Sequence, residues 1–430
     1  MRNTNIILCV LISTIVKAQL NPAITSWLQN TTKTGTYYPK GNPSLTENNI
    51  LVNCQKVEYS DDFVYVTATG IPSYPTGPFN DGNPSNAENQ NGIYKIPLNP
   101  SQNTSELDAT VGGNIGLFIN GVALFDYRDG VAWNPQTNAL CGGPGNPRCP
   151  GGPNASMAWN RDAIPAEKEG FDCAKGHPAM GNYHHHQNPS AFKLDLEVIS
   201  DICNIYDAEG LYAIDSTKHS PLIGFAYDGY PIYGAYGYAN NDGTGGITRI
   251  KSGYQLRNIT ERTHHHDGTD VDDGPAIDAT YFLGYFREDY GFNASQQEDV
   301  LDEHNGRFCI TPEYPEGTYA YFCTVDGDWN SAYPYAVGPF FYGNFELRNV
   351  SSVDAETTVY IPATNNISIL DRTKITVFPN PASDLIAIQL GGLNRNNVQI
   401  TLSGMNGKKI SSTSIPPGST ITYYDVQTVY

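Results

Sequence analysis

The 430-residue chain is predicted to be mainly β: a β-sandwich-like domain with long loops, followed by a small C-terminal β-sandwich. Three observations predict this class. Apolar residues alternate with polar ones over short runs, and almost no segment keeps a helical period. Gly, Pro and Asn interrupt these runs, with 42 Gly and 29 Pro in total, which is typical of turns between strands. The 29 Tyr residues favour strands with aromatic faces.

The N-terminus has the pattern of a secretory signal peptide over residues 1–18. Arg2 supplies the positive end, Ile6 to Val16 forms an apolar core too short to span a bilayer, and Ala18 ends a small-residue cleavage site. No later stretch of about 18 apolar residues follows. We therefore expect an exported mature protein, secreted or held at the cell surface, without a membrane span.

The charge of the chain limits its partners. It carries 25 basic and 44 acidic residues, a formal net charge of −19. Loss of Arg2 and Lys17 with the signal peptide removes two positive charges and makes the mature charge −21. Such an acidic protein is repelled by nucleic acid and by anionic membranes, which excludes both as partners.

The length favours two or three domains. Residues 19–49 are polar and are expected to be an irregular lead-in. Residues 50–348 are expected to form one mainly β domain, in which the alternating run 63–70 is a strand. Residues 190–215 have an ambiguous period, and one helix is the expected element there.

Two hairpins are predicted inside this domain. Residues 116–127 form two strand-like runs around Asn120-Gly121, and residues 221–238 form two more around Asp228-Gly229. Asn-Gly and Asp-Gly are the dipeptides most typical of tight hairpin turns. Both turns are therefore expected to join neighbouring antiparallel strands.

Seven cysteines remain after signal cleavage, and in an exported protein most should form disulfides. Cys141 and Cys149 bracket a Gly/Pro loop that one bridge would pin. Cys309 and Cys323 bracket a segment with a turn signal between strand-like flanks, which predicts a bridge across a hairpin. No Cys-x-x-Cys pair occurs, and this disfavours a zinc–thiolate site.

A separate module is expected at the C-terminus. Residues 349–371 are rich in Ser, Thr, Val and Asn and are predicted to be a linker. Residues 372–430 then hold five basic and two acidic residues, a charge of +3 on a chain that is otherwise strongly acidic.

This module contains "VFPNPA" at residues 377–382, a strand-like run at 385–390 and "GMNGK" at 404–408. In these residues it resembles the C-terminal sorting domain of proteins exported by the type IX secretion system. That family usually closes with a Gly-x-Tyr-x-Val strand pair, whereas the sequence here ends "TYYDVQTVY". The resemblance implies transport across the outer membrane, with the type IX secretion machinery as a partner.

Four segments of the body match one family pattern together. They are "NYHHH" at 182–186, "KHSPLIGFAYDGYPIYG" at 218–234, "LDEHNGRFCITPEYPEGTYAYF" at 301–322 and "YPYAVGP" at 333–339. In these segments, over residues of about 180–340, the chain resembles the YHYH family, named for a Tyr-His-Tyr-His stretch. His185 stands where that family has its second Tyr. The resemblance implies a shared fold. It implies no activity, because none is established for that family.

Two triplets hold six of the nine histidines. Because side chains alternate along a strand, His184 and His186 point to one face and His185 to the other. The family pattern has Tyr at position 185, which favours a packing role for His185. A His-x-His pair is a common geometry for two ligands of one metal ion, so His184 and His186 are predicted metal ligands. The alternative is that they are hydrogen-bonded core histidines.

His219 is the predicted third ligand, because it precedes the strand of the second hairpin and can fold against the first motif. Imidazole ligands suit zinc or copper. His264 and His266 repeat the His-x-His spacing and are second-tier candidates, on what is otherwise a surface loop.

Carboxylates supply the remaining candidates. Asp228 and Asp302 are candidate catalytic groups, although Asp228 also suits a hairpin turn. The acidic run "DGTDVDDG" at 267–274 offers oxygen ligands for calcium, without the spacing of an EF-hand loop.

Two functions from different classes follow from these features. The first is a secreted metal-binding β protein, with metal-dependent hydrolysis or oxidation as the chemistry that an open position on the ion would supply. The second is a secreted binding or adhesion module that contacts glycans or other extracellular polymers, in which the histidines are structural.

Overall fold

The computed structural model describes residues 20–42, 44–79, 86–105, 107–151, 157–189, 215–345, 349–353, 356–362, 375–378, 385–390, 398–403, 409–416 and 421–425. The chain divides into two compact units, Leu20–Pro362 and a unit that contains the strands from residue 375 onward. Both are built from strands, so the predicted mainly β class is confirmed. The helix expected at 190–215 lies outside the described residues, apart from Asp215.

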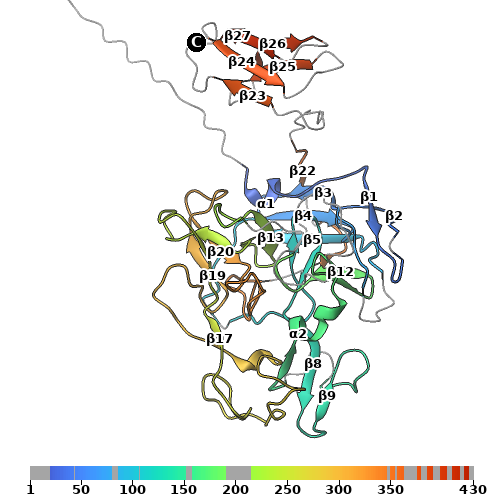
Figure 1. Ribbon diagram of the computed structural model, residues 1–430, viewed down its shortest axis with the longest axis vertical. Helices are drawn as coiled ribbons and strands as arrows, with labels where there is room; N and C mark the ends of the chain where they lie inside the picture. Colours follow the sequence, from blue (N-terminus) through green and yellow to red (C-terminus); the bar gives the residue numbers. More distant parts are fainter. Residues whose placement is uncertain are drawn as a thin grey trace, which may run out of the picture. The chain divides into compact units, whose positions relative to one another are not determined.

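The body contains one large mixed sheet (Figure 1). Its eight strands, in spatial order, are β11 (His177–Ala179), β12 (Asn182–His185), β7 (Ala123–Phe125), β6 (Asn114–Phe118), β13 (Leu222–Ala226), β14 (Pro231–Tyr233), β20 (Thr318–Phe322) and β19 (Gly306–Cys309). Both predicted hairpins are present in it. Gly121, with φ of 76°, turns the chain from β6 to β7, and Gly229, with φ of 95°, turns it from β13 to β14.

A five-stranded antiparallel sheet packs against one face of the large sheet. Its order is β21 (Asn349–Val350), β5 (Gly92–Pro97), β4 (Phe63–Ala68), β3 (Cys54–Tyr59) and β22 (Thr358–Val359). Leu117, Phe225 and Phe322 of the large sheet share one apolar cluster with Val57 and Val66 of the smaller sheet. This contact between sheet faces is the sandwich-like part of the fold.

The large sheet is also buried on its other face. Phe118, Ala226 and Tyr321, each next in sequence to a residue of the first face, lie in a second apolar cluster with Tyr74 and Tyr183. A strand that is buried on both sides has no polar face, which explains why β13 reads "LIGFA" without alternation.

Smaller elements surround these sheets. They are the pairs β1 (Thr34–Tyr37) with β2 (Thr46–Leu51), β15 (Tyr236–Tyr238) with β16 (Ile247–Arg249) and β17 (Tyr254–Leu256) with β18 (Tyr290–Phe292), and the helical turns α1 (Pro22–Thr25), α2 (Ala163–Glu167), η1 (Lys168–Gly170) and η3 (Arg287–Asp289). The residues expected to be an irregular lead-in therefore hold α1 and β1, and Ile24 and Trp27 are buried in the core.

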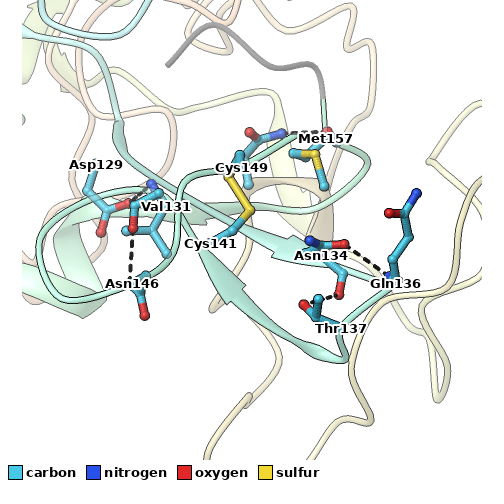
Figure 2. The surroundings of a disulfide bond; sticks show 11 residues. Asp129, Val131, Asn134, Gln136, Thr137, Cys141, Asn146, Cys149 and Met157 are labelled. Atoms are coloured by element: carbon cyan, nitrogen blue, oxygen red, sulfur yellow. Dashed lines mark hydrogen bonds between the residues drawn. A yellow bond between two sulfur atoms is a disulfide. The ribbon is translucent and has the colours of Figure 1, made fainter. Parts of the chain in front are cut away.

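A three-stranded sheet of the body is formed by β10 (Asn160–Asp162), β8 (Arg128–Asn134) and β9 (Ala139–Cys141). Figure 2 shows the Cys141–Cys149 disulfide at the end of β9, with Cα atoms 4.8 Å apart, and this predicted bridge is confirmed.

The predicted bridge between Cys309 and Cys323 is wrong, because both cysteines are free and buried. The register pairs Cys309 with Thr318, so Cys323 lies five residues further along the neighbouring strand. At about 3.3 Å per residue, that offset is far beyond the reach of a disulfide. Cys173, by contrast, is disulfide-bonded.

The segment expected to be a linker, 349–371, starts inside the body. Its β21 and β22 form the two edges of the five-stranded sheet, and the first unit ends at Pro362. The second unit holds a sheet of β23 (Ile375–Phe378), β24 (Leu385–Leu390) and β27 (Ile421–Asp425), and a pair of β25 (Val398–Ser403) with β26 (Lys409–Ile415).

Candidate metal centre

A tight hairpin forms the base of the site. β11 and β12 are joined by Met180 and Gly181, and both have positive φ, 49° and 85°. Two such residues make the turn that matches the twist of antiparallel strands, and the two-residue turn sets the register. As a result, His177 pairs directly with His184 across the hairpin.

Three histidines converge on one face of this hairpin. Side chains that pair directly across antiparallel strands share a face, and so do residues two apart along one strand. His177, His184 and His186 therefore point the same way, and each offers a ring nitrogen within 4.8 Å of the other two. All three are buried, with 5%, 1% and 3% of their surface exposed.

His185 points to the opposite face. Its Nε2 lies 2.8 Å from the Tyr74 hydroxyl, its Nδ1 donates to the Lys175 carbonyl at 3.0 Å, and its ring packs on Phe118. The neighbouring Tyr183 donates to Asp172 on that same face. The middle histidine of the triplet is thus part of the aromatic core.

Backbone carbonyls orient two of the converging rings. His184 Nδ1 lies 2.8 Å from the Asn182 carbonyl, and His186 Nδ1 lies 2.5 Å from the Asp126 carbonyl. A carbonyl only accepts, so both Nδ1 atoms carry the hydrogen, and in neutral rings both Nε2 atoms present lone pairs. These two Nε2 atoms are 3.1 Å apart. Facing lone pairs repel at this distance, so a cation, either a proton or a metal ion, is required between them.

Glu167, at the end of α2, adds a negative charge. Its Oε2 lies 3.2 Å from His177 Nε2 and 3.3 Å from His186 Nε2. Burial raises the pKa of this carboxyl, but the two imidazoles lower it by more, so the pKa stays below its ordinary value. Glu167 therefore remains an anion at neutral pH.

Aromatic rings enclose the histidines. Phe125 stacks on His184 with ring centroids 3.7 Å apart, and Phe171 packs edge-on against His177 at 4.7 Å. Burial lowers the pKa of His184 well below its ordinary value, and the neighbouring His177 and His186 lower it further. A neutral imidazole is the form that binds a metal ion.

The structure places His219 apart from this cluster. Its Nδ1 donates to the Ser220 carbonyl at 2.7 Å, and its ring packs against Tyr233 and Tyr238. Within the described residues, His177 takes the third position that the sequence interpretation gave to His219.

The two candidate catalytic carboxylates serve as acceptors at turns. Asp228 is fully buried and accepts from the Tyr321 hydroxyl at 2.5 Å and from the Gly343 amide at 2.8 Å. Burial raises its pKa to about 6. Asp302 accepts from the Tyr319 hydroxyl at 2.8 Å and from two amides of its own turn.

The second His-x-His pair lies on an exposed loop. His264 Nε2 is 3.4 Å from Asp270, whereas His266 Nε2 donates to the Phe292 carbonyl at 2.8 Å. The four aspartates of the acidic run 267–274 are exposed. Among the described residues, only His177, His184 and His186 form a group of three side chains with metal-ligand spacing.

Sequence reasoning missed His177 and Glu167. The signal for His177 was the pair Met180-Gly181, because a two-residue turn there puts residue 177 opposite residue 184. Met is rarely the first residue of such a turn, since it disfavours positive φ. Glu167 had no local signal, because its approach depends on the packing of α2.

Comparison with protein families agrees with this architecture. A family model described as YHYH protein matches residues 93–333, more than half of the chain. The chain belongs to the YHYH family. The matched part of this YHYH protein includes His177, His184 and His186, and also Glu167. No curated protein and no solved structure matches it.

The C-terminal unit has its own match. A model described as a secretion system C-terminal sorting domain matches residues 376–429. This YHYH protein is therefore exported, to the cell surface or beyond, and the type IX secretion machinery handles it. No helix among the described residues is long and apolar enough to cross a membrane.

Proposed function

We propose that this exported YHYH protein binds one divalent transition-metal ion through a ring nitrogen of His177 and the Nε2 atoms of His184 and His186. The observation that carries the proposal is the approach of two Nε2 lone pairs to 3.1 Å, next to a third imidazole and an anionic carboxylate. A divalent cation satisfies all four groups at once. Imidazole donors suit zinc or copper.

The backbone carbonyls support this proposal. A metal-binding histidine normally donates its other ring N–H to a carbonyl or carboxylate, which fixes the ring and the free nitrogen. Asn182 and Asp126 provide such carbonyls for His184 and His186. When bound, zinc or copper would supply Lewis-acid chemistry for hydrolysis, and copper would also supply oxidation.

The competing function keeps the histidines structural, with a proton in place of the metal ion, and assigns binding of glycans or other polymers to the Tyr- and Trp-rich loops. A single proton shared by His184 and His186 also removes the lone-pair repulsion. Two ring nitrogens lie 3.2 and 3.3 Å from Glu167 Oε2, but neither meets this buried oxygen in good hydrogen-bonding geometry. A metal ion would satisfy the oxygen without that geometry, which favours the metal ion.

The test is elemental analysis of the purified full-length protein beside two double variants. His184→Ala/His186→Ala removes the proposed ligands, and His264→Ala/His266→Ala removes a pair of identical spacing from an exposed loop. We expect about one equivalent of zinc or copper in the parent and in the loop variant, and none in the hairpin variant.

A second measurement separates lost binding from lost folding. Adding zinc to the chelator-treated parent should raise its melting temperature, because a ligand that binds only the folded state stabilises it. A parent that carries no metal, and whose melting temperature zinc and copper leave unchanged, would refute the metal site and leave the structural alternative.

A further inference from the structure

Glu167 approaches the histidines at the distances of a coordinating group. The spacings are 3.2 Å from its Oε2 to His177 Nε2, 3.3 Å to His186 Nε2, and 3.1 Å between the Nε2 atoms of His184 and His186. Metal–ligand bonds to His and Glu are about 2.0–2.1 Å, and the edge of a tetrahedron with such bonds is about 3.3–3.4 Å. These three spacings are close to that edge. The ring nitrogens of the three histidines lie within 4.8 Å of one another, so the set closes to a tetrahedron only if the side chains move inward when the ion binds.

The alternative role for a carboxylate beside a metal ion is to hold a bound water as a general base. That role needs room for the water between the ion and the carboxylate oxygen. An oxygen already 3.2–3.3 Å from two ligand nitrogens leaves no such room. The position therefore fits a ligand and not a base that acts through water.

The fold holds Glu167 in place. Asp162 caps the start of α2 by accepting from the Ile164 amide at 2.9 Å, and it also accepts from the buried Tyr335 hydroxyl at 2.6 Å. Ile164 packs in an apolar cluster with Tyr335 and Phe171, and Phe171 contacts His177. The end of the helix is thus positioned against the histidines by contacts that involve no metal ion.

We infer that Glu167 is the fourth ligand, which gives a set of three imidazoles and one carboxylate with the donor types that suit zinc. This inference rests on the proposed metal site. Four-coordinate tetrahedral sites with nitrogen and oxygen donors suit zinc, whereas copper(II) prefers tetragonal geometry. A carboxylate oxygen also disfavours copper(I), which prefers soft sulfur ligands.

The experiment compares the full-length protein with Glu167→Gln and with Glu169→Gln. Gln keeps the shape of the side chain and removes its charge, and the exposed Glu169, two residues later, is the matched control. Cobalt(II) serves as a spectroscopic probe for zinc, because its visible absorption is intense when four-coordinate and weak when six-coordinate. Zinc affinity is measured by competition with a chromophoric chelator.

We expect the intense cobalt spectrum in the parent and in Glu169→Gln, and its loss or large change in Glu167→Gln. Zinc affinity should fall roughly 100-fold or more in Glu167→Gln, at least as much as removal of a second-shell partner costs. An unchanged spectrum and affinity in Glu167→Gln would overturn the inference and leave the three-histidine site intact. Absence of metal binding in the parent would refute both.

A measurement on the parent alone covers the case in which Glu167→Gln fails to fold. Infrared difference spectra of protein labelled with ¹³C-carboxyl glutamate, recorded with and without zinc, report a carboxylate that becomes a ligand. A shift in the labelled carboxylate stretch on zinc binding supports the inference, and a labelled band that does not move overturns it.

Discussion

His177 lies directly opposite His184 across the β11–β12 hairpin, with ring centroids 4.6 Å apart. Six residues lie between the two in sequence, and the two-residue turn at Met180-Gly181 alone decides that they meet. A slip of one residue would move His177 to the face of Tyr183 and His185. The candidate metal centre therefore depends on this turn, which sets the register of the strands, as much as on the histidines.

Substitution of Gly181 should weaken both the hairpin and metal binding. A Cβ at this position would stand 2.9 Å from the Glu88 carboxylate, and φ of 85° is costly for any residue with a side chain. We expect Gly181→Ala to lower the free energy of unfolding by about 1 kcal/mol, measured by urea denaturation, and to lower zinc affinity. Unchanged values for both would contradict this account of the turn.

The matched control is Met180→Asn in the same turn. Met180 has φ of 49° and is 94% exposed, so its side chain contributes little packing. Asn tolerates positive φ better than Met, and Asn-Gly is a preferred hairpin turn. We expect this variant to keep or slightly raise the stability and to bind zinc as the parent does.

His177→Ala and His219→Ala should separate the ligand from the core histidine. We expect His177→Ala to lose the bound ion, because it removes one of three converging imidazoles. His219→Ala should lower the melting temperature, since its ring packs on Tyr233 and Tyr238, and should keep the ion. Metal analysis of both variants decides the matter, and the reverse pattern would restore His219 as the ligand.

The sequence predicted the parts of this structure that depend on local chemistry. Asn120-Gly121 and Asp228-Gly229 specify their turns through residues that accept positive φ, and both hairpins formed where expected. Strand alternation placed His184 and His186 on one face and His185 on the other. The Cys141–Cys149 bridge closes a loop of seven intervening residues and needed no knowledge of the fold.

The remainder depends on contacts that are distant in sequence. The edge strands β21 and β22 become strands only because β5 and β3 offer free edges. Glu167 reaches the histidines through the packing of α2, and His219 is held in an aromatic pocket of strands β14, β15 and β20. Composition and spacing carry no information about such approaches.

Buried Tyr–Asp pairs explain part of the abundance of tyrosine. In each, a strand or loop tyrosine donates to a carboxylate that also accepts backbone amides of a turn or helix start. The pairs are Tyr183–Asp172, Tyr319–Asp302, Tyr321–Asp228 and Tyr335–Asp162. They fasten loops to the sheets, so the two candidate catalytic aspartates have a structural explanation.

Tyr321→Phe should therefore be strongly destabilising. The Tyr321 hydroxyl donates to Asp228 and accepts from the Tyr342 amide at 2.7 Å. Phe would leave the buried Asp228 carboxylate and the partly buried Tyr342 amide short of a partner, at a cost of about 2 kcal/mol in the free energy of unfolding. We expect zinc binding to be retained in the folded fraction.

Tyr230→Phe is the control for this change. Tyr230 packs on Tyr319 and Tyr342, and its hydroxyl makes no hydrogen bond to the described residues. Its loss should cost much less than the loss of the Tyr321 hydroxyl. Equal costs in the two variants would show that aromatic packing, and not the Asp228 contact, stabilises this region.

Asp162 should make the metal-free protein less stable as pH rises from 7 to 8. Burial raises its pKa to about 8, although the Tyr335 hydroxyl and the Ile164 amide lower it in part. The folded state therefore holds a proton that the unfolded state, with a pKa of about 3.9, releases, so stability falls as pH rises through the folded pKa. Buried histidines such as His184, with lowered pKa, act in the opposite direction only below about pH 6.5.

Asp162→Asn keeps the helix cap and should make the free energy of unfolding nearly independent of pH between pH 7 and 8 in chelator-treated protein. Asp172→Asn should leave that slope in place, because the pKa of Asp172 is raised only to about 6, and an unchanged slope in Asp162→Asn would contradict the assignment.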